Sequence, residues 1–254
     1  MKRNNEITHD NRVNMSLIGN TTCTKDIIPS IEVWSLFQRK DFSLKDANSR
    51  LCALKGENTL ANHKLVYNRI EKVCEYFIQT HPNLTATIVV PSTNQLNKYL
   101  FEELIRGNKG AMILDNVFVR MTCEEVDDFI WEDNSAFRKK YGDKFEWYYE
   151  MFLRFCSKMI DGVFRYHLIK DMEMRKAIDH TIKSEDKFYG KYMSAINGKD
   201  ILIVDESAIT AKSIREAYHI IADCYEPKSI TVLTLLSPRY NENGKNKQAN
   251  LWHY

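Results

Sequence analysis

The sequence contains little proline and glycine, has no long apolar run and is almost neutral, and each of these absences excludes a class of protein. Five prolines and nine glycines among 254 residues exclude a collagen-like or Gly/Pro-rich low-complexity chain. No run approaches the ~20 apolar residues of a membrane span, and the first residues, MKRNNEITHDNRVNMSLIGN, lack the apolar region of a secretory signal. The formal net charge of +2 gives no reason to expect nucleic acid or a membrane as partner.

The cysteines show no pattern of a metal site or a redox motif. None is arranged as C-x-x-C, and no tight Cys/His cluster has the spacing of a zinc site. We therefore expect reduced thiols that pack as small apolar groups in a cytoplasmic protein. The six are Cys23, Cys52, Cys74, Cys123, Cys156 and Cys224.

Apolar residues make up 44% of the chain and charged residues 28%, as in an ordinary globular protein. We predict an N-terminal arm over 1–57, an α/β domain over 58–240 and a C-terminal tail over 241–254. Within the α/β domain, the region of about 122–160 is crowded with aromatic and acidic residues at helical spacing. It predicts a helical insertion that packs its aromatic rings against the core of the domain.

The α/β domain shows two strand–helix–strand patterns, which are typical of a parallel sheet. The first has strands at 84–90 and 111–119 around a helix at 95–106, and the second has strands at 200–205 and 229–236 around a helix at 212–224. A short strand over 31–37 and a helix over 58–80 precede them, and we also expect a strand over 163–168 and a mobile basic segment over 170–191. The prediction is an α/β fold, Rossmann-like, with a mainly parallel sheet flanked by helices.

The residues with the clearest chemistry lie in ILIVDESAITAKS, 201–213. An apolar strand delivers Asp205 and Glu206 to the carboxyl end of a sheet, where ligands of open α/β sheets bind. Thr210 and Ser213 then open a helix, whose free N–H groups and dipole favour an anion. Paired acids beside a phosphate cradle suit a sugar phosphate. The acids could also be a solvated strand end, and the hydroxyls could be N-caps of the helix.

This segment resembles the phosphoribosyl-pyrophosphate signature of the type I phosphoribosyltransferases. The resemblance implies that the catalytic acids Asp205 and Glu206 hold the ribose hydroxyls. It also implies a 5′-phosphate loop made of Ser207, Ala208, Ile209, Thr210, Ala211, Lys212 and Ser213. Ala211 stands where the family usually has glycine, which tolerates backbone angles that alanine does not.

A second stretch is similar to another part of that family. Ile88 to Asn94 resembles the first core strand with its diphosphate loop, and Ser92, Thr93 and Asn94 are the matching loop positions. Taken alone, this stretch could equally be a turn that caps the next helix. The two loops lie about 110 residues apart in the order that the family has. The segment 180–200 adds some similarity to competence-associated phosphoribosyltransferases.

The family also has a flexible loop that closes over the substrate, and its equivalent is expected between 120 and 190. Several cations could contact the diphosphate, but each is more simply interpreted as a charge on the protein surface. The candidate cations are Lys98, Arg165, Lys170, Arg175 and Lys187.

The resemblance implies transfer of phosphoribose from phosphoribosyl pyrophosphate to a nitrogen acceptor, a nucleobase by preference, with release of diphosphate. It implies Mg²⁺ as cofactor, bound mainly through ligand oxygens and water, and a role of the insertion in a hood that selects the acceptor. The alternative is a regulatory module of the same fold that binds a phosphorylated ribose without turnover, which the alanine at 211 favours. The acceptor and a homo-oligomeric state are left open. An ordinary dinucleotide-binding enzyme is less well supported, because no G-x-G-x-x-G follows a strand.

Overall fold

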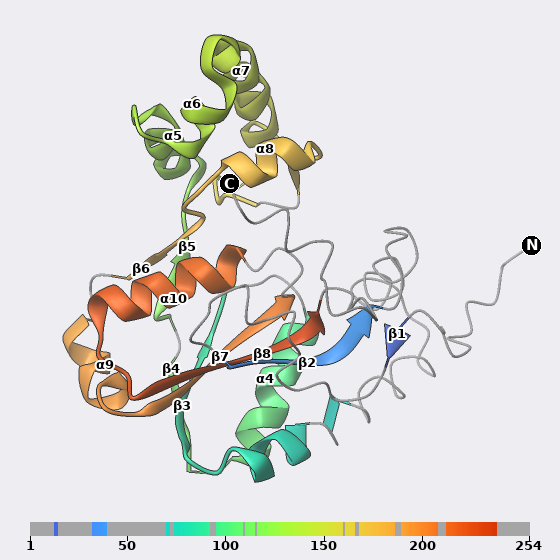
Figure 1. Cartoon of the computed structure of the whole chain (residues 1–254), viewed down its shortest axis with the longest axis vertical. Helices are drawn as coiled ribbons and strands as arrows, with labels where there is room; N and C mark the ends of the chain where they lie inside the picture. Colours follow the sequence, from blue (N-terminus) through green and yellow to red (C-terminus); the bar gives the residue numbers. More distant parts are fainter. Residues whose placement is uncertain are drawn as a thin grey trace, which may run out of the picture. The chain divides into compact units, whose positions relative to one another are not determined.

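A computed structural model of the chain shows two compact units (Figure 1). It describes residues 13–14, 32–39, 70–71, 74–91, 95–108, 110–114, 116–159, 161–165, 168–185, 189–207 and 212–237, with only the backbone at some of these positions. The sheet unit comprises Met1–Val117 and Lys187–Tyr254, and the helical unit comprises Phe118–Asp186. The helical unit therefore includes the predicted insertion and extends beyond both of its ends.

The sheet unit is built on a mainly parallel sheet in the order β1-β2-β8-β7-β3-β4. All neighbouring pairs from β2 to β4 are parallel, and β1 at the other edge is antiparallel to β2. The strands are β1 (Val13–Asn14), β2 (Glu32–Arg39), β3 (Leu84–Val89), β4 (Met112–Leu114), β7 (Asp200–Ser207) and β8 (Ser229–Ser237). The predicted α/β class with a mainly parallel sheet flanked by helices is confirmed.

β7 lies inside the sheet because its sequence suits burial on both faces. Ile201, Leu202, Ile203 and Val204 form a continuous apolar run, and none is more than 2% exposed. A strand covered by helices on both faces has such a run, whereas a half-exposed strand alternates apolar and polar residues. At its amino end, Gly198 adopts φ 69° in the predicted turn, a conformation that glycine reaches without a steric cost.

The helices cover the two sides of this sheet. α4 (Gln95–Gly107) connects β3 to β4, α10 (Lys212–Cys224) connects β7 to β8, and α9 (Tyr189–Ile196) precedes β7. The step from β3 to β4 runs in the opposite direction across the sheet to the step from β7 to β8. Right-handed crossovers therefore place α4 and α10 on opposite faces, as Figure 1 shows. Residues 70–71 and 74–80 are helical, in agreement with the predicted helix over 58–80.

The helical unit consists of short helices and one two-stranded antiparallel ribbon. Its elements are β5 (Phe118–Arg120), α5 (Cys123–Trp131), α6 (Ala136–Tyr141), the 3₁₀ helix η1 (Gly142–Lys144), α7 (Phe145–Cys156), α8 (Met172–Ala177) and β6 (Ile182–Ser184). β5 pairs with β6, so the two ends of the unit lie side by side. Thr122 caps α5 in a complete capping box with Glu125, which satisfies two of the free N–H groups at this helix start.

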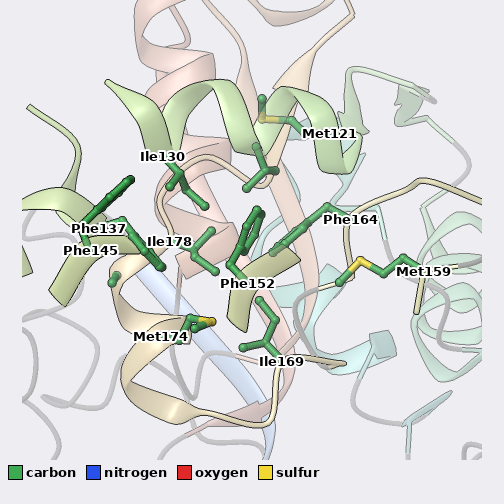
Figure 2. Packing of buried hydrophobic residues seen from close by; sticks show 12 residues of the cluster. Met121, Ile130, Phe137, Phe145, Phe152, Met159, Phe164, Ile169, Met174 and Ile178 are labelled. Carbon is green, nitrogen blue, oxygen red and sulfur yellow. The ribbon is translucent and has the colours of Figure 1, made fainter. Parts of the chain in front are cut away.

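The helical unit has its own apolar core, which Figure 2 shows. Phe137, Phe152 and Phe164 are at most 1% exposed and come from α6, α7 and the segment after α7. Tyr148 and Phe155, two further aromatic residues of the predicted insertion, pack against the core that contains Phe152. The sequence-based expectation that the insertion buries aromatic rings is thus confirmed, but the core that they form is that of the helical unit itself.

Three local expectations are corrected. The strand predicted over 111–119 is two strands, because Asn116 between them has φ 64° and breaks the extended backbone. The strand predicted over 163–168 is an isolated bridge from Val163 to Thr122. The segment predicted to be mobile over 170–191 contains α8 and β6, with Met174 and Ile178 fully buried in the core.

Among the described residues, no helix has the length and apolar character needed to span a bilayer.

Candidate functional site

The carboxyl ends of β3 and β7 lie side by side in the sheet. Val89 is in register with Val204, and the Val90 N–H donates to the Val204 carbonyl over 2.9 Å. The connections leave these two strands in opposite directions, so the strand order reverses between them. Open α/β sheets bind their ligands at such a switch point, outside the carboxyl ends of the strands. The structure therefore places the strands of both predicted binding loops at the same point of the sheet.

Asp205 is at this edge and is largely shielded from water. It is 8% exposed and in register with Thr234 of β8. The Thr234 side chain is fully buried, and its hydroxyl donates to the Trp34 carbonyl over 3.4 Å. Carboxylates are seldom buried to this extent, and a low local dielectric strengthens the hydrogen bonds that a carboxylate accepts. Burial thus strengthens the hydrogen bonds that the Asp205 carboxylate accepts.

Only part of the predicted 5′-phosphate loop is described. Glu206 and Ser207 belong to the backbone of β7, with Ser207 in register with Leu236, while their side chains lie outside the described residues. Ala208, Ile209, Thr210 and Ala211 also lie outside the described residues, as do Ser92, Thr93 and Asn94 of the diphosphate loop. Lys212 and Ser213 are the first two residues of α10 and are half-buried.

α10 begins close to the end of β7 in the chain. Ile214, Ala217 and Ile221 are fully buried along one side of α10, which packs beside β7. The first N–H groups of a helix have no partner within the helix, and the dipole adds positive potential at that end. The start of α10 therefore offers donors for an anion close to the carboxyl end of β7.

Thr234, in register with Asp205, and Arg215, in the first turn of α10, are absent from the sequence-based expectations. Arg215 lies in the first turn of α10 and is half-buried, and burial lowers the pKa of its guanidinium. The sequence does give a sign of Arg215, because this cation stands between Ile214 and Ala217, two buried positions of an amphipathic helix. Thr234 has no such signal, because only the register of β7 against β8 places it beside Asp205.

The candidate cations of the helical unit have local roles. Arg165 forms an ion pair with Asp161, and the Arg175 Nε donates to the Ile169 carbonyl. Lys170 is exposed. Lys187 and the side chain of Lys98 lie outside the described residues. Arg165 and Arg175 thus interact with residues of the helical unit itself.

Across the described part of the chain, no three His, Cys, Asp or Glu side chains are grouped so that they could hold a metal ion. No model of a known protein family matches the chain, and no curated protein matches it. The functional interpretation therefore depends on the residues at the β3–β7 edge.

Proposed function

We propose that the sheet unit binds phosphoribosyl pyrophosphate and is a type I phosphoribosyltransferase-like domain. The reaction would transfer phosphoribose to a nitrogen acceptor, a nucleobase by preference, in the cytoplasm. The observation that carries the proposal is the pairing of β3 with β7 at the point where the strand order reverses. This pairing brings together the ends of two strands whose following loops both resemble those of the family.

The pairing supports a ligand with several anionic groups. The loop after β3 matches the diphosphate loop, and the loop after β7 matches the 5′-phosphate loop. In phosphoribosyl pyrophosphate, the ribose lies between the 5′-phosphate and the diphosphate at C1. Asp205 lies near the end of β7, which pairs with β3, so we propose that its carboxylate binds the hydroxyls of the ribose. The half-buried Lys212 and Ser213 would act at the 5′-phosphate with the first N–H groups of α10.

The chemical step that we propose is a displacement at C1 of the ribose. The acceptor nitrogen forms a bond to C1, the bond from C1 to the diphosphate oxygen breaks, and its electron pair leaves with the diphosphate. Positive charge develops on the ribose ring as the bond to the diphosphate breaks, and a nearby carboxylate at Asp205 would be favourable there. The acceptor nitrogen gives up its N–H proton to water once its bond to C1 has formed. Holding the ribose between two anchored phosphates contributes positioning and electrostatic stabilisation.

At this edge, Mg²⁺ would be bound mainly by the oxygens of the substrate and not by a cluster of protein side chains. Mg²⁺ keeps several waters and prefers carboxylate and phosphate oxygens, and the described residues supply no three-ligand protein cluster. We propose that the ion neutralises the diphosphate when bound. Asp205 is the described carboxylate at this edge of the sheet.

A regulatory module that binds the same ligand without turnover is the second candidate, because Ala211 replaces the usual glycine of the phosphate loop. The test is diphosphate release from phosphoribosyl pyrophosphate and Mg²⁺ over a panel of nucleobases. Release that depends on one base supports the transferase. Binding of phosphoribosyl pyrophosphate with no release for any base supports the regulatory module, and absence of binding contradicts both.

The Ala211→Gly variant separates the two candidates further. If the loop accepts the alanine methyl group, we expect the affinity for phosphoribosyl pyrophosphate to stay the same and the stability to fall by up to ~1 kcal/mol, since glycine adds freedom to the unfolded chain. Titration of the parent and the variant side by side measures this. A tenfold gain in affinity, ~1.4 kcal/mol, would instead show that the methyl group impairs the parent and would favour the regulatory module.

A further inference from the structure

Two cysteines meet at one end of the helical unit. Cys123 is the first residue of α5 and Cys156 is the last residue of α7. The Cys123 thiol donates to the Met159 sulfur over 3.4 Å, and the Met159 N–H donates to the Cys156 carbonyl over 2.9 Å. Both cysteines are free and partly exposed. Met159 thus contacts both cysteines, and a small reagent has access to each of them.

The backbone holds these two helix ends together. The Cys123 N–H donates to the Gly162 carbonyl over 2.8 Å, and the Gly162 N–H donates to the Met159 carbonyl over 3.1 Å. Thr122 forms a bridge with Val163 on the same segment. The turn that follows α7 is therefore hydrogen-bonded to the start of α5. A disulfide needs two cysteines whose backbones are already close, and these hydrogen bonds hold the start of α5 and the end of α7 near each other.

The two thiols differ in how readily they ionise. Burial raises the pKa of Cys123, but a hydrogen bond with Cys156 acts in the opposite direction. Burial also raises the pKa of Cys156, and the charge of Cys123 raises it further. In addition, Cys123 lies at the start of α5, where the helix dipole favours a thiolate. Cys123 is therefore the better nucleophile of the pair, and Cys156 is placed to respond to it.

We propose that Cys123 and Cys156 are a thiol–disulfide site that a low-molecular-weight disulfide, such as oxidised glutathione, converts into an intramolecular disulfide. The Cys123 thiolate attacks one sulfur of oxidised glutathione, which forms a mixed disulfide and releases one glutathione. The Cys156 thiolate then attacks the Cys123 sulfur, and the second glutathione leaves. Two protein thiols are oxidised, and one glutathione disulfide is reduced to two thiols.

The bridge would join the start of α5 to the end of α7 covalently. Both helices contribute to the core of the helical unit, α5 through Val126 and Ile130 and α7 through Phe152. A cross-link between them restricts the unfolded chain. We therefore expect the oxidised protein to melt at a higher temperature than the reduced protein.

The test treats the full chain with oxidised glutathione and maps the products by mass spectrometry without reduction. We expect the parent to lose two hydrogen atoms and to give linked peptides containing Cys123 and Cys156. The Cys156→Ser variant should keep one glutathione on Cys123, because no second thiol displaces it. The Cys123→Ser variant should form neither the bridge nor that adduct. Cys224, partly exposed at the end of α10, supplies the control, and Cys224→Ser should form the bridge as the parent does.

A result with the parent alone can contradict the proposal, so the test does not depend on whether a variant folds. Both thiols remaining reduced in the parent, or either one linked to another cysteine of the same chain, would contradict it. An adduct on Cys224 but none on Cys123 in Cys156→Ser would also contradict it. Circular dichroism of each serine variant checks that the protein tested is folded.

Discussion

Asp200 and Asp205 occupy opposite ends of β7 and face different surroundings. The Asp200 carboxylate accepts from the Ser229 hydroxyl over 2.6 Å and from the Lys228 ammonium over 3.0 Å. These two hydrogen bonds hold the pKa of Asp200 below its usual range. Asp205 is at the carboxyl end, where the switch point lies. Asp200 therefore serves the structure and makes a matched control for any binding role of Asp205.

Glu173 of the helical unit has a strongly lowered pKa. It accepts from Lys140 over 2.7 Å and pairs also with Lys176. These hydrogen bonds, that from Lys140 first, lower the pKa of Glu173 from 4.5 to about 2. A carboxylate with a depressed pKa stabilises the folded state fully above its unfolded pKa. That contribution is lost as the pH falls from about 4.5 to about 2.

We predict that Glu173→Gln lowers the free energy of unfolding at pH 7, but by no more than ~1 kcal/mol, because exposed ion pairs are screened by solvent. The side chain is 59% exposed. Urea denaturation at a series of pH values measures the difference from the parent, which should shrink as the pH falls toward 2. Glu150→Gln is the control, since its pair with Arg154 spans 3.6 Å on an exposed helix face. A pH-independent difference for Glu173→Gln would contradict the assignment.

At the scale of elements, α7 sets the core of the helical unit. Phe152 is fully buried, while its neighbour Leu153 is 41% exposed. Figure 2 shows Phe152 among the labelled side chains of the core, close to Phe164 and Ile178. The two positions thus differ in burial on the same turn of the same helix.

We predict that Phe152→Ala costs ~3–5 kcal/mol of stability, because it removes buried apolar surface and leaves a cavity. Leu153→Ala should change the stability by less than ~0.5 kcal/mol, as expected of a surface position. Urea denaturation followed by circular dichroism compares the two variants. Equal losses in both would show that this face of α7 is not the buried one.

Elements with strong local signals could be predicted from the sequence. α10 has the predicted bounds, Lys212–Cys224, because its start signals and its apolar period agree. β7 has the predicted start, since four apolar residues follow a turn. The segment 170–191 was harder to predict, because few apolar residues, such as Met174 and Ile178, stand among many charges. Their burial depends on contacts with α6 and α7, which local sequence does not specify.

At the scale of the whole molecule, the sequence suggested candidate residues after two strands, but it did not show that these two strands are neighbours. β3 and β7 are separated by about 110 residues, and the helical unit lies between them in the chain. Strand order is a long-range property, which local sequence patterns do not specify. The register of β7 against β8 places Thr234 beside Asp205, so this neighbour emerged only from the structure.

The most direct test of the central claim, that the β3–β7 edge binds a phosphorylated ribose, is calorimetric titration with phosphoribosyl pyrophosphate and Mg²⁺. We predict binding by the parent, and a loss of ~1.5–3 kcal/mol in Asp205→Asn, the scale of charge-assisted hydrogen bonds. Asp200→Asn, at the other end of the same strand, should bind as the parent does even if its stability falls. Equal affinity in the parent and in folded Asp205→Asn, or no binding by the parent, would contradict the account.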